Sequence, residues 1–527
     1  MKIKYESFIP VSDTSVHNCF QDLIANIGQL TGRGFEMFFS DSWRFEFDLQ
    51  GFLGQGGAIG EHMKVEAEYS NEYFQKYHGI AVSHLLANPL NHKSFAEVLL
   101  NLEEGFPLII LIDNYIIPWG KDYLKTHSPH YIMPIGYDRD TNTVQCIDPI
   151  FSKNIEVLPA DLLNEYNLRE VIYKLDVLEK YEEPSLMDYI QDIKSLSQRI
   201  YSENHVEDIA SLSKLIGESG FDVLREFSVD ESADFWNCAL LLSLRRVIFG
   251  RHYFSKILNS ASLRYRNKDF YFLSTEANSI CKQWENIRLL LFKAYYTKKI
   301  NSKDLSKRLL NIAVLEEQFI DTLLNNDLRT LPHPTGSLTP PVKRASDIHV
   351  NLNIEHLFNN KGFAHNEGYN ADFTGLGEFL MESHSAVNAK KFTPDIQKRF
   401  DNISCAAETI ILPPEKVGYY DFISIIGCAE WGDCTDSLQV VYEDNEVILF
   451  PLNITDWAAE KPRFGEEVVW EGICGNKDKE KEPASMKVYI YDQTIKISKR
   501  KKIKEIKLPQ CPNIHIFSIE LIDSQTR

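Results

Sequence analysis

The chain has 527 residues, with 56 Lys and Arg against 75 Asp and Glu, which gives a formal net charge of −19. At about 150 residues per domain, this length predicts three or four domains. The negative charge excludes the bulk basic field that is typical of proteins binding nucleic acids or anionic membranes. With 44% hydrophobic and 25% charged residues, the composition is that of a globular protein and excludes disorder over the whole chain.

Cysteine usage and the N-terminal sequence indicate a reducing, cytoplasmic location. The nine cysteines are odd in number and have no motif spacing, which argues against a disulfide framework and against a CxxC-type zinc site. The first ten residues contain no apolar core of a signal peptide. The most apolar run, Phe106 to Ile112, is far too short to span a bilayer. We therefore expect a soluble, cytoplasmic protein that binds neither membranes nor nucleic acids.

The N-terminal third of the chain mixes helix and strand signals. The continuous apolar run from Leu108 to Ile112 predicts a central strand. Residues 131–137 and 144–148 predict two further strands, which the polar turn 138–143 would join as a hairpin. We expect an α+β domain over residues 1–178.

The rest of the chain changes character twice. Between residues 179 and 330, Gly and Pro are scarce and apolar residues return every three to four positions, which predicts a bundle of four to six helices. The prolines of residues 331–345 predict a linker. Short strand-like runs follow over residues 346–527 and predict a β-sandwich or jelly roll. The expected fold class is multidomain α+β, with a helical middle region and a C-terminal β-sandwich.

Cys19 carries the sharpest chemical signal. Apolar residues recur at helical spacing from Phe20 to Ile27, which predicts an amphipathic helix that begins at Cys19. A thiol at a helix N-terminus lies near the positive end of the helix dipole and near free backbone N–H groups, and both favour the thiolate. The same N–H groups can stabilise an oxyanion. Asn18 or Ser15 could cap the helix, although a buried, inert cysteine is equally common at such a position.

A histidine and an aspartate that could complete a catalytic site lie on the predicted hairpin. His130 opens its first strand and Asp148 ends its second, so an antiparallel ladder would place the two residues side by side. A carboxylate in that place fixes the imidazole tautomer and stabilises the imidazolium. A cysteine on a helix, with a histidine and an aspartate on neighbouring strands, is a papain-like arrangement.

The motifs around these residues resemble those of a known family. They are His17-Asn-Cys19, the segment Gly105–Tyr115 with Pro118 after it, and His127-x-x-His130-Tyr followed by Gly136-Tyr-Asp138 and Asp148-Pro149. Together they resemble the N-terminal domain of the butirosin-biosynthesis acyltransferase family, which is itself similar to bacteriocin-processing, papain-like cysteine peptidases. The resemblance covers residues 10–175, and the helical region after it is similar to that family's usual companion.

The resemblance implies an acyl transfer in natural-product assembly, such as antibiotic biosynthesis. An acyl group would arrive as a thioester on an acyl carrier protein or a peptide-synthetase carrier domain, pass to the cysteine, and be handed to a small amine, without a cofactor. Cys19 would be the nucleophile, His130 the general base and Asp148 the orienter. We prefer His130 to His127 because it directly precedes the strand. No upstream glutamine is identified for the oxyanion hole, so the Cys19 backbone N–H takes that role, with Asn18 as a further candidate.

Other interpretations of the same residues stay open. With water as the acceptor the chain would be a papain-like peptidase or amidase, and without catalysis it would be a binding scaffold. His127 and His130 have a spacing compatible with metal ligands, but no further ligand cluster accompanies them, and we expect no metal.

Two other segments bear on ligands and partners. The glycine-rich stretch Gly51–Gly60 lacks the Gly-Lys-Ser/Thr ending of a phosphate-binding loop, so we expect a flexible loop near the thiol. Carrier proteins are usually acidic, so docking to this acidic chain would need a local basic or apolar patch, such as the helices around Arg245, Arg246 and Arg251.

Residues 346–525 carry a second resemblance. Phe358–Gly362, Asp372–Gly377, Tyr420–Glu430 and Ile454–Trp457 are similar to segments of the galactose-binding-like jelly rolls that are attached to glycoside hydrolases. Exposed aromatic rings stack on sugar faces, which makes Trp431 and Trp457 candidates. An Asp-Trp pair at a strand end is more often structural, and no paired carboxylates indicate a glycosidase.

Overall fold

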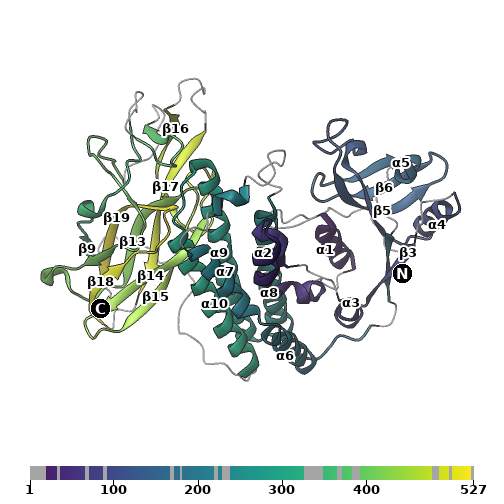
Figure 1. The fold of residues 1–527 in the computed structure, drawn as a ribbon, viewed down its shortest axis with the longest axis horizontal. Helices are drawn as coiled ribbons and strands as arrows, with labels where there is room; N and C mark the ends of the chain where they lie inside the picture. Colours follow the sequence, from purple (N-terminus) through teal and green to yellow (C-terminus); the bar gives the residue numbers. More distant parts are fainter. Residues whose placement is uncertain are drawn as a thin grey trace. The chain divides into compact units, whose positions relative to one another are not determined.

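The structure is a computed structural model of the chain, and it describes residues 19–31, 36–65, 70–86, 92–165, 171–178, 181–218, 223–227, 238–325, 348–364, 371–382, 392–477, 486–497 and 501–523. The chain divides into two compact units. Unit 1 consists of Met1–Ser211, Ala239–Cys281 and Ala313–His333, and unit 2 of Leu212–Cys238, Lys282–Ile312 and Pro334–Arg527. The expected α+β N-terminal region, helical middle region and C-terminal sheets are all present (Figure 1). The domain boundaries at residues 178, 330 and 345 stay predictions.

Unit 1 is built around a six-stranded antiparallel sheet with the order β3-β8-β4-β5-β6-β7. All six residues of β4 are buried, as its uninterrupted apolar sequence predicts. Asp138 and Asn142 form the predicted turn between β5 and β6: the Asp138 carboxylate accepts the Asp140 N–H at 2.8 Å, and Asn142 has a φ of 52°. The strands are β3 (Ile80–Leu86), β4 (Leu108–Asp113), β5 (Pro129–Asp138), β6 (Thr143–Ile147), β7 (Ile155–Pro159) and β8 (Val171–Val177).

Helices cover both faces of this sheet, and they lie on opposite sides of it in Figure 1. On one face, α1 (Cys19–Thr31) packs against β5 through Leu23, Ile24 and Ile27, beside Phe74 of α3 (Asn71–His78). On the other face lie α4 (His92–Glu103) and α5 (Ala160–Glu165). The strand residues alternate between the two cores, because successive side chains of a strand point to opposite faces. The sheet therefore holds α1, and with it Cys19, in a fixed place on β5.

The glycine-rich stretch is not the flexible loop that the sequence predicts. Most of it forms α2 (Leu49–Gln55), whose first turn is capped by Asp48, and η2 (Ile59–His62). Only Gly56 and Gly57 take positive φ angles within it. Gly60 packs against the start of α8, where Ser243 donates a hydrogen bond to its carbonyl oxygen at 3.0 Å. A side chain at position 60 would collide with that helix backbone, so packing explains this glycine.

Five α helices make up the described middle region. They are α6 (Leu186–Ser202), α7 (His205–Gly217), α8 (Ala239–Tyr265), α9 (Lys268–Thr297) and α10 (Ser302–Asn325). Short elements complete the connections: η1 (Glu36–Trp43), β1 (Glu46–Phe47), β2 (Met63–Lys64), η3 (Asn114–Ile116) and η4 (Val223–Phe227). None of the helices in the described ranges combines the length and apolar character needed to cross a membrane.

A buried ion-pair network joins helices of unit 1. The carboxylate of Glu316, on α10, accepts two hydrogen bonds from the Arg251 guanidinium at 2.9 and 2.8 Å, one from the Trp43 indole at 3.1 Å, and contacts His205. Burial alone raises the pKa of Glu316, but Arg251 and His205 outweigh it and hold this pKa well below its usual range. Arg251 is fully buried, so it cannot belong to the basic docking patch that the sequence suggested.

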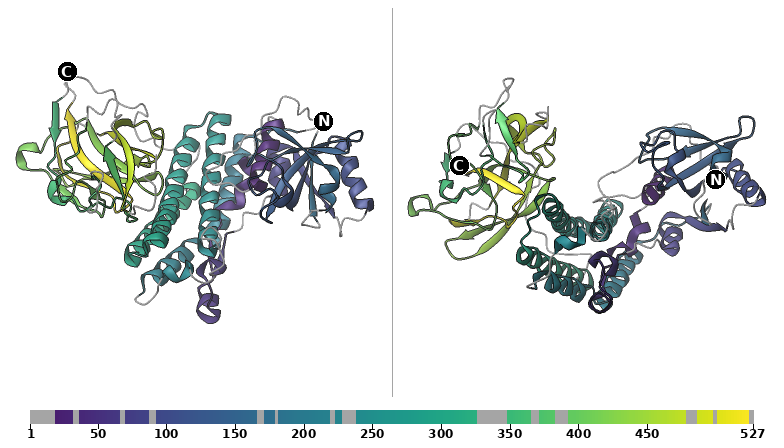
Figure 2. Two further views of the ribbon diagram at one scale, coloured as in Figure 1. Left: turned by 90° about the horizontal axis from the view of Figure 1, so that it is seen from above. Right: turned by 45° about the horizontal axis from the view of Figure 1, so that its top comes forward.

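Unit 2 contains two antiparallel sheets that share one hydrophobic core, coloured green to yellow in Figure 2. The larger has the order β10-β16-β17-β13-β19-β11, with β9 paired to β19, and the smaller has the order β12-β18-β14-β15. The jelly-roll topology stays a prediction. The elements are β9 (Ile348–Asn351), η6 (Glu355–Leu357), β10 (Glu378–Glu382), β11 (Ile403–Ser404), β12 (Thr409–Ile411), η7 (Pro414–Lys416), β13 (Phe422–Ala429), β14 (Cys434–Tyr442), β15 (Val447–Ile454), β16 (Glu467–Asn476), β17 (Lys487–Lys496), β18 (Ile503–Lys507) and β19 (Ile514–Asp523).

Candidate active site

Cys19 is the first residue of α1 and is half-buried. The apolar face of α1 fixes the helix against β5, so the thiol lies beside the start of that strand. The backbone N–H of Tyr131 donates to Cys19 Sγ at 3.4 Å. Asn18, the second oxyanion candidate, and the possible cap Ser15 lie outside the described residues. Cys19 therefore occupies the expected helix N-terminus, next to the strand that carries His130.

His130 and Asp148 meet where the sequence predicts. His130 is the second residue of β5, and Asp148 directly follows β6. Because the two strands run antiparallel, the start of one lies beside the end of the other. His130 Nε2 is 3.1 Å from Asp148 Oδ1, and both side chains are buried. The contact is an ion pair whose N–H direction deviates from the line of an ideal hydrogen bond.

The imidazole of His130 links the thiol to the carboxylate. Its Nε2 faces Asp148, and the interaction of the ring with the Cys19 thiol raises the pKa of His130. This leaves Nδ1 as the nitrogen that can exchange a proton with Cys19 Sγ. The order thiol–imidazole–carboxylate is the nucleophile–base–orienter sequence of covalent catalysis.

The electrostatics of the site favour a thiolate–imidazolium pair. Burial raises the pKa of Cys19, but the hydrogen bond and charge of His130, with the N–H groups of Tyr131 and Phe20, bring it below its ordinary value. Burial lowers the pKa of His130, but its close polar contacts with Asp148 and Cys19 and the charges of these two groups raise it to about 9. Both shifts favour the pair in which the proton resides on the imidazole and the sulfur is the anionic nucleophile.

Two aromatic side chains complete the site, and neither was expected from the sequence. The indole N–H of Trp119 donates to Asp148 Oδ2 at 2.9 Å, which leaves the other carboxylate oxygen for His130. The ring of Phe151 lies over the imidazole, with centroids 4.8 Å apart. Both residues lie in loops whose sequences have no helix or strand periodicity. The Asp148-Pro149 turn, just before Phe151, is the one local sequence signal for the position of Phe151, and Trp119 has no such signal. They orient the carboxylate and cover the imidazole from solvent.

His127 forms a separate, exposed pair. Its Nδ1 is 2.6 Å from Asp113 Oδ2, and its ring stacks on Tyr115 with centroids 4.3 Å apart. Burial raises the pKa of Asp113, but the bond from His127 and the N–H groups of Tyr115 and Ser128 bring it below its usual value. His127 is thus engaged away from the thiol, and the structure places His130 beside Cys19. No group of three or more potential metal ligands occurs among the described residues.

The tryptophans that the second resemblance singled out are used in packing. Trp457 is buried, with its ring centroid 4.9 Å from that of Phe373. Trp431 donates its indole N–H to the Thr374 carbonyl at 3.4 Å, and Tyr296 of α9 stacks on its ring with centroids 5.5 Å apart. Stacking on a sugar needs an exposed ring face, so the buried Trp457 has the structural role that is more common for an Asp-Trp pair. One face of Trp431 is occupied by Tyr296.

The different pH dependences of alkylation and turnover test the ion pair. With a His130 pKa of about 9, the imidazolium is present below that pH and is lost above it. The thioester turnover that the motif resemblance implies should fall above about pH 9, because a neutral His130 has no proton to give to a leaving group. Alkylation of Cys19 by iodoacetamide needs only the thiolate, so it should persist there. Both rates would be measured from about pH 5 to about pH 10, and an alkylation rate that falls together with turnover would contradict the assignment.

Comparisons with known proteins agree with this geometry at the level of the scaffold. Residues 50–171 match the model of the Peptidase_C39 like family. The matched segment contains His130 and Asp148 and begins after Cys19. The N-terminal region therefore has a papain-like scaffold related to cysteine peptidases, as the sequence predicts.

The other comparisons add little. No curated protein matches the chain. Among solved structures, the chain is similar to a family GH115 4-O-methyl-α-glucuronidase with specificity for decorated arabinogalactans, at 10% sequence identity and a TM-score of 0.15. That similarity covers 64% of this chain and 40% of the glucuronidase chain, so this chain spans less than half of its length. A similarity this low supports no argument about fold or function.

Proposed function

We propose that the chain is a cysteine-dependent acyltransferase that moves an acyl group from a carrier-protein thioester to an amine in natural-product biosynthesis. The observation that carries the proposal is the juxtaposition of Cys19, His130 and Asp148 at one end of β5 and β6. The papain-like scaffold supports the cysteine chemistry, and the motif resemblance supports the thioester donor and the amine acceptor.

The first half of the reaction forms an acyl-enzyme. The Cys19 thiolate attacks the thioester carbonyl, and the carbonyl oxygen becomes an oxyanion. The backbone N–H at the start of α1 is the donor available for that oxyanion among the residues described, and it lies at the positive end of the helix dipole. When the tetrahedral intermediate collapses, the C–S bond to the carrier breaks, and the imidazolium of His130 gives its proton to the departing thiolate. The acyl group is then held on Cys19 as a new thioester.

The second half transfers the acyl group to the acceptor. Neutral His130 accepts a proton from the incoming amine as its nitrogen attacks the acyl carbonyl. The amide bond forms, the bond to Cys19 breaks, and the sulfur leaves as a thiolate beside the regenerated imidazolium. Throughout, Asp148 stabilises the imidazolium, and Trp119 holds the carboxylate in place.

A peptidase or amidase is the second candidate, and the match to the Peptidase_C39 like family favours it. The same three side chains would hydrolyse an amide if water replaced the amine. The two functions share the acyl-enzyme and differ only in the acceptor. The distinction therefore depends on how the acyl-enzyme partitions between water and amines.

A partition experiment separates the two functions. The chain would be given a short acyl pantetheine thioester with and without a primary amine, and the products would be quantified by mass spectrometry. An acyltransferase should give the amide as the main product, and the amide should be absent with Cys19→Ala. Release of free acid only, at a rate that the amine does not change, would overturn the transferase proposal and favour the hydrolase.

A further inference from the structure

Two loops of unit 1 lie beside the pair of His130 and Asp148. The loop that joins β4 to β5 carries Trp119, whose indole N–H donates to Asp148 at 2.9 Å. The turn that joins β6 to β7 carries Phe151, whose ring centroid lies 4.8 Å from that of His130. The residues that follow these two aromatic side chains are therefore held close to the candidate active site.

Three exposed lysines follow on these loops. Lys121 is two residues after the tryptophan, and Lys153 is two residues after the phenylalanine. Because the chain extends at most about 3.6 Å per residue, each of these lysine backbones lies within about 7 Å of the backbone of its aromatic neighbour. Lys125 Nζ donates to the Lys121 carbonyl at 3.3 Å and so belongs to the same group. We call Lys121, Lys125 and Lys153 the basic rim.

The lysines of the basic rim have no carboxylate partner in the described part of the chain. Between residues 36 and 178, the other cationic side chains that the structure describes are ion-paired with carboxylates; they are Arg44, Lys64, Lys76, Arg139 and Lys174. No described carboxylate lies within ion-pair distance of Lys121, Lys125 or Lys153. The unpaired cations of this region are thus gathered beside the candidate active site.

The carboxylates near the basic rim are engaged by other groups. Asp122 accepts a hydrogen bond from the Asn114 amide at 3.1 Å, and Glu156 accepts one from a serine hydroxyl of the adjoining turn at 2.5 Å. Asp113 is paired with His127 at 2.6 Å. Asp122 and Glu156 are half-buried and Asp113 is buried, whereas the lysines are exposed. These loops therefore present positive charge to solvent, on a chain with a net charge of −19.

An exposed apolar pair accompanies the basic rim. Tyr123 and Leu124, which are 38% and 58% exposed, lie between two of the lysines in the sequence. Leu124 has a φ of 53°, in the left-handed region that bulky residues rarely adopt, and its N–H donates to the Tyr115 carbonyl at 2.9 Å. Such strained residues cluster at functional sites. Apolar side chains with charged ones at their margin are typical of protein interfaces.

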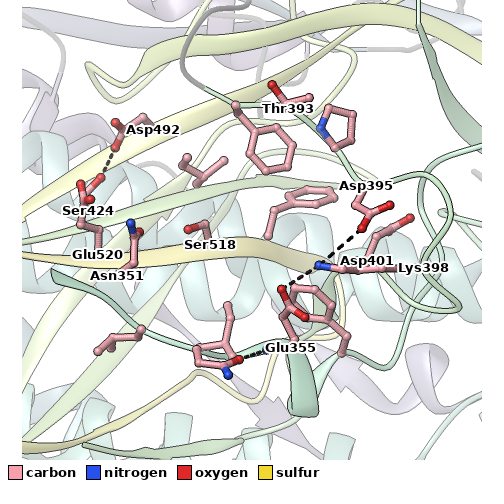
Figure 3. A pocket seen from close by; sticks show the side chains of 18 of the residues that line it. Asn351, Glu355, Thr393, Asp395, Lys398, Asp401, Ser424, Asp492, Ser518 and Glu520 are labelled. Atoms are coloured by element: carbon pink, nitrogen blue, oxygen red, sulfur yellow. Dashed lines mark hydrogen bonds and ion pairs between the residues drawn. The ribbon is translucent and has the colours of Figure 1, made fainter. Parts of the chain in front are cut away.

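Charges that are paired within the chain give a partner no such field. Unit 2 contains a cavity of about 690 Å³, shown in Figure 3. Among its lining residues, Lys398 lies 2.7 Å from Glu355 and 3.9 Å from Asp395, and Glu520 lies 2.7 Å from His349. These groups compensate one another and favour neither sign of ligand charge. The basic rim differs because its lysines lack such partners among the described residues.

We infer that the basic rim, together with Tyr123 and Leu124, is the docking surface for an acidic acyl carrier protein. The inference rests on the proposed acyl transfer, because a carrier-borne thioester has to reach Cys19 and this surface lies beside the catalytic pair. The chain as a whole repels an acidic protein, and the basic rim reverses that repulsion locally. The exposed apolar pair supplies area that association would bury.

Binding of a labelled carrier tests the surface without any chemistry. The probe is a fluorescently labelled acyl carrier protein of net negative charge in its holo form, added to the full chain with Cys19→Ala, and fluorescence anisotropy measures the affinity. The affinity should fall about tenfold or more between about 0.05 M and about 0.5 M salt, because salt screens exposed charges. Replacing all three lysines of the basic rim with glutamate should weaken binding at about 0.15 M salt by about tenfold or more, since like charges then face each other.

Two further variants separate this surface from bulk charge. Lys299→Glu, Lys303→Glu and Lys307→Glu together change the net charge by the same amount on exposed lysines of unit 2, and they should leave the affinity unchanged. Leu124→Asn removes an apolar contact while asparagine tolerates the left-handed conformation, so it should weaken binding roughly threefold to tenfold. It also keeps the test informative if the glutamate variant of the basic rim fails to fold.

Two acyl donors separate this inference from the proposed function. With the native Cys19 in place, the glutamate variant of the basic rim should be acylated by an acyl pantetheine thioester at the native rate, and by the acyl carrier protein about tenfold more slowly or less. If neither donor acylates Cys19 although the carrier docks on the basic rim, the proposed acyl transfer fails and the docking surface stands. If the pantetheine thioester acylates Cys19 but the carrier does not dock, only the docking surface fails.

The inference is overturned if the holo carrier does not bind at the lower salt, or if the glutamate variant of the basic rim binds it as tightly as the native surface does. Equal weakening by the three substitutions in unit 2 would assign the effect to bulk charge and would also overturn it. So would 4′-phosphopantetheine alone binding as tightly as the holo carrier, because the lysines would then recognise the phosphate and no protein surface.

Discussion

Replacing His130 with alanine should slow alkylation of Cys19 by iodoacetamide at pH 5 by on the order of tenfold to a hundredfold. In the native chain the imidazolium outweighs the burial of the thiol and keeps its pKa below the ordinary value. Without His130, burial dominates and the thiolate fraction at acid pH becomes very small. The lower intrinsic nucleophilicity of a low-pKa thiolate offsets part of this loss. Peptide mass spectrometry would follow the reaction, because only Cys19 and Cys238 are not buried.

His127→Ala is the matched control for this experiment. His127 lies three residues from His130 but pairs with Asp113 and stacks on Tyr115. Its loss should leave the alkylation rate of Cys19 unchanged. If His127→Ala slowed alkylation as much as His130→Ala, the base would have been assigned to the wrong histidine.

Replacing Glu316 with leucine should lower the free energy of unfolding by about 3–5 kcal/mol. The substitution leaves the fully buried guanidinium of Arg251 without its carboxylate and removes the acceptor of the Trp43 indole. An uncompensated buried charge is among the most destabilising changes in a protein interior. Urea unfolding followed by tryptophan fluorescence would measure the effect.

Two further variants make this stability test specific. The double variant Arg251→Met with Glu316→Leu should recover much of the loss, since neither charge then remains. Glu183→Leu removes the partner of Arg264, a more exposed arginine on the same helix, and it should cost no more than about 1 kcal/mol. A loss of similar size in Glu316→Leu and Glu183→Leu would refute the special role of burial.

The parts of the site that the sequence predicted are those with local causes. His130 and Asp148 flank a hairpin, and antiparallel pairing alone brings the start of one strand to the end of the next. The apolar spacing after Cys19 predicts α1 and the position of the thiol at its N-terminus. The approach of α1 to β5 is not local, and the family resemblance, rather than periodicity, suggested it.

The parts that were missed depend on contacts between distant segments. Trp119 lies in an irregular loop, and its bond to Asp148 follows only from the path of that loop. Arg251 has the sequence signature of an exposed basic helix position, but it is buried because Glu316, on another helix, lies opposite. The glycine-rich stretch that contains Gly60 predicted a flexible loop, whereas the close approach of the α8 backbone to Gly60 explains this glycine. In each case the deciding partner is far away in the sequence.

The most direct test of the account is the mass of the chain after incubation with an acyl pantetheine thioester in the absence of an amine. We expect an increase equal to the mass of the acyl group, located on the peptide that contains Cys19 and reversed by hydroxylamine. Cys19→Ala should show no increase, and His130→Ala should acquire it far more slowly, while His127→Ala should match the native chain. An unmodified chain that nevertheless consumes the thioester, or an adduct on Cys238 that persists in Cys19→Ala, would contradict the account.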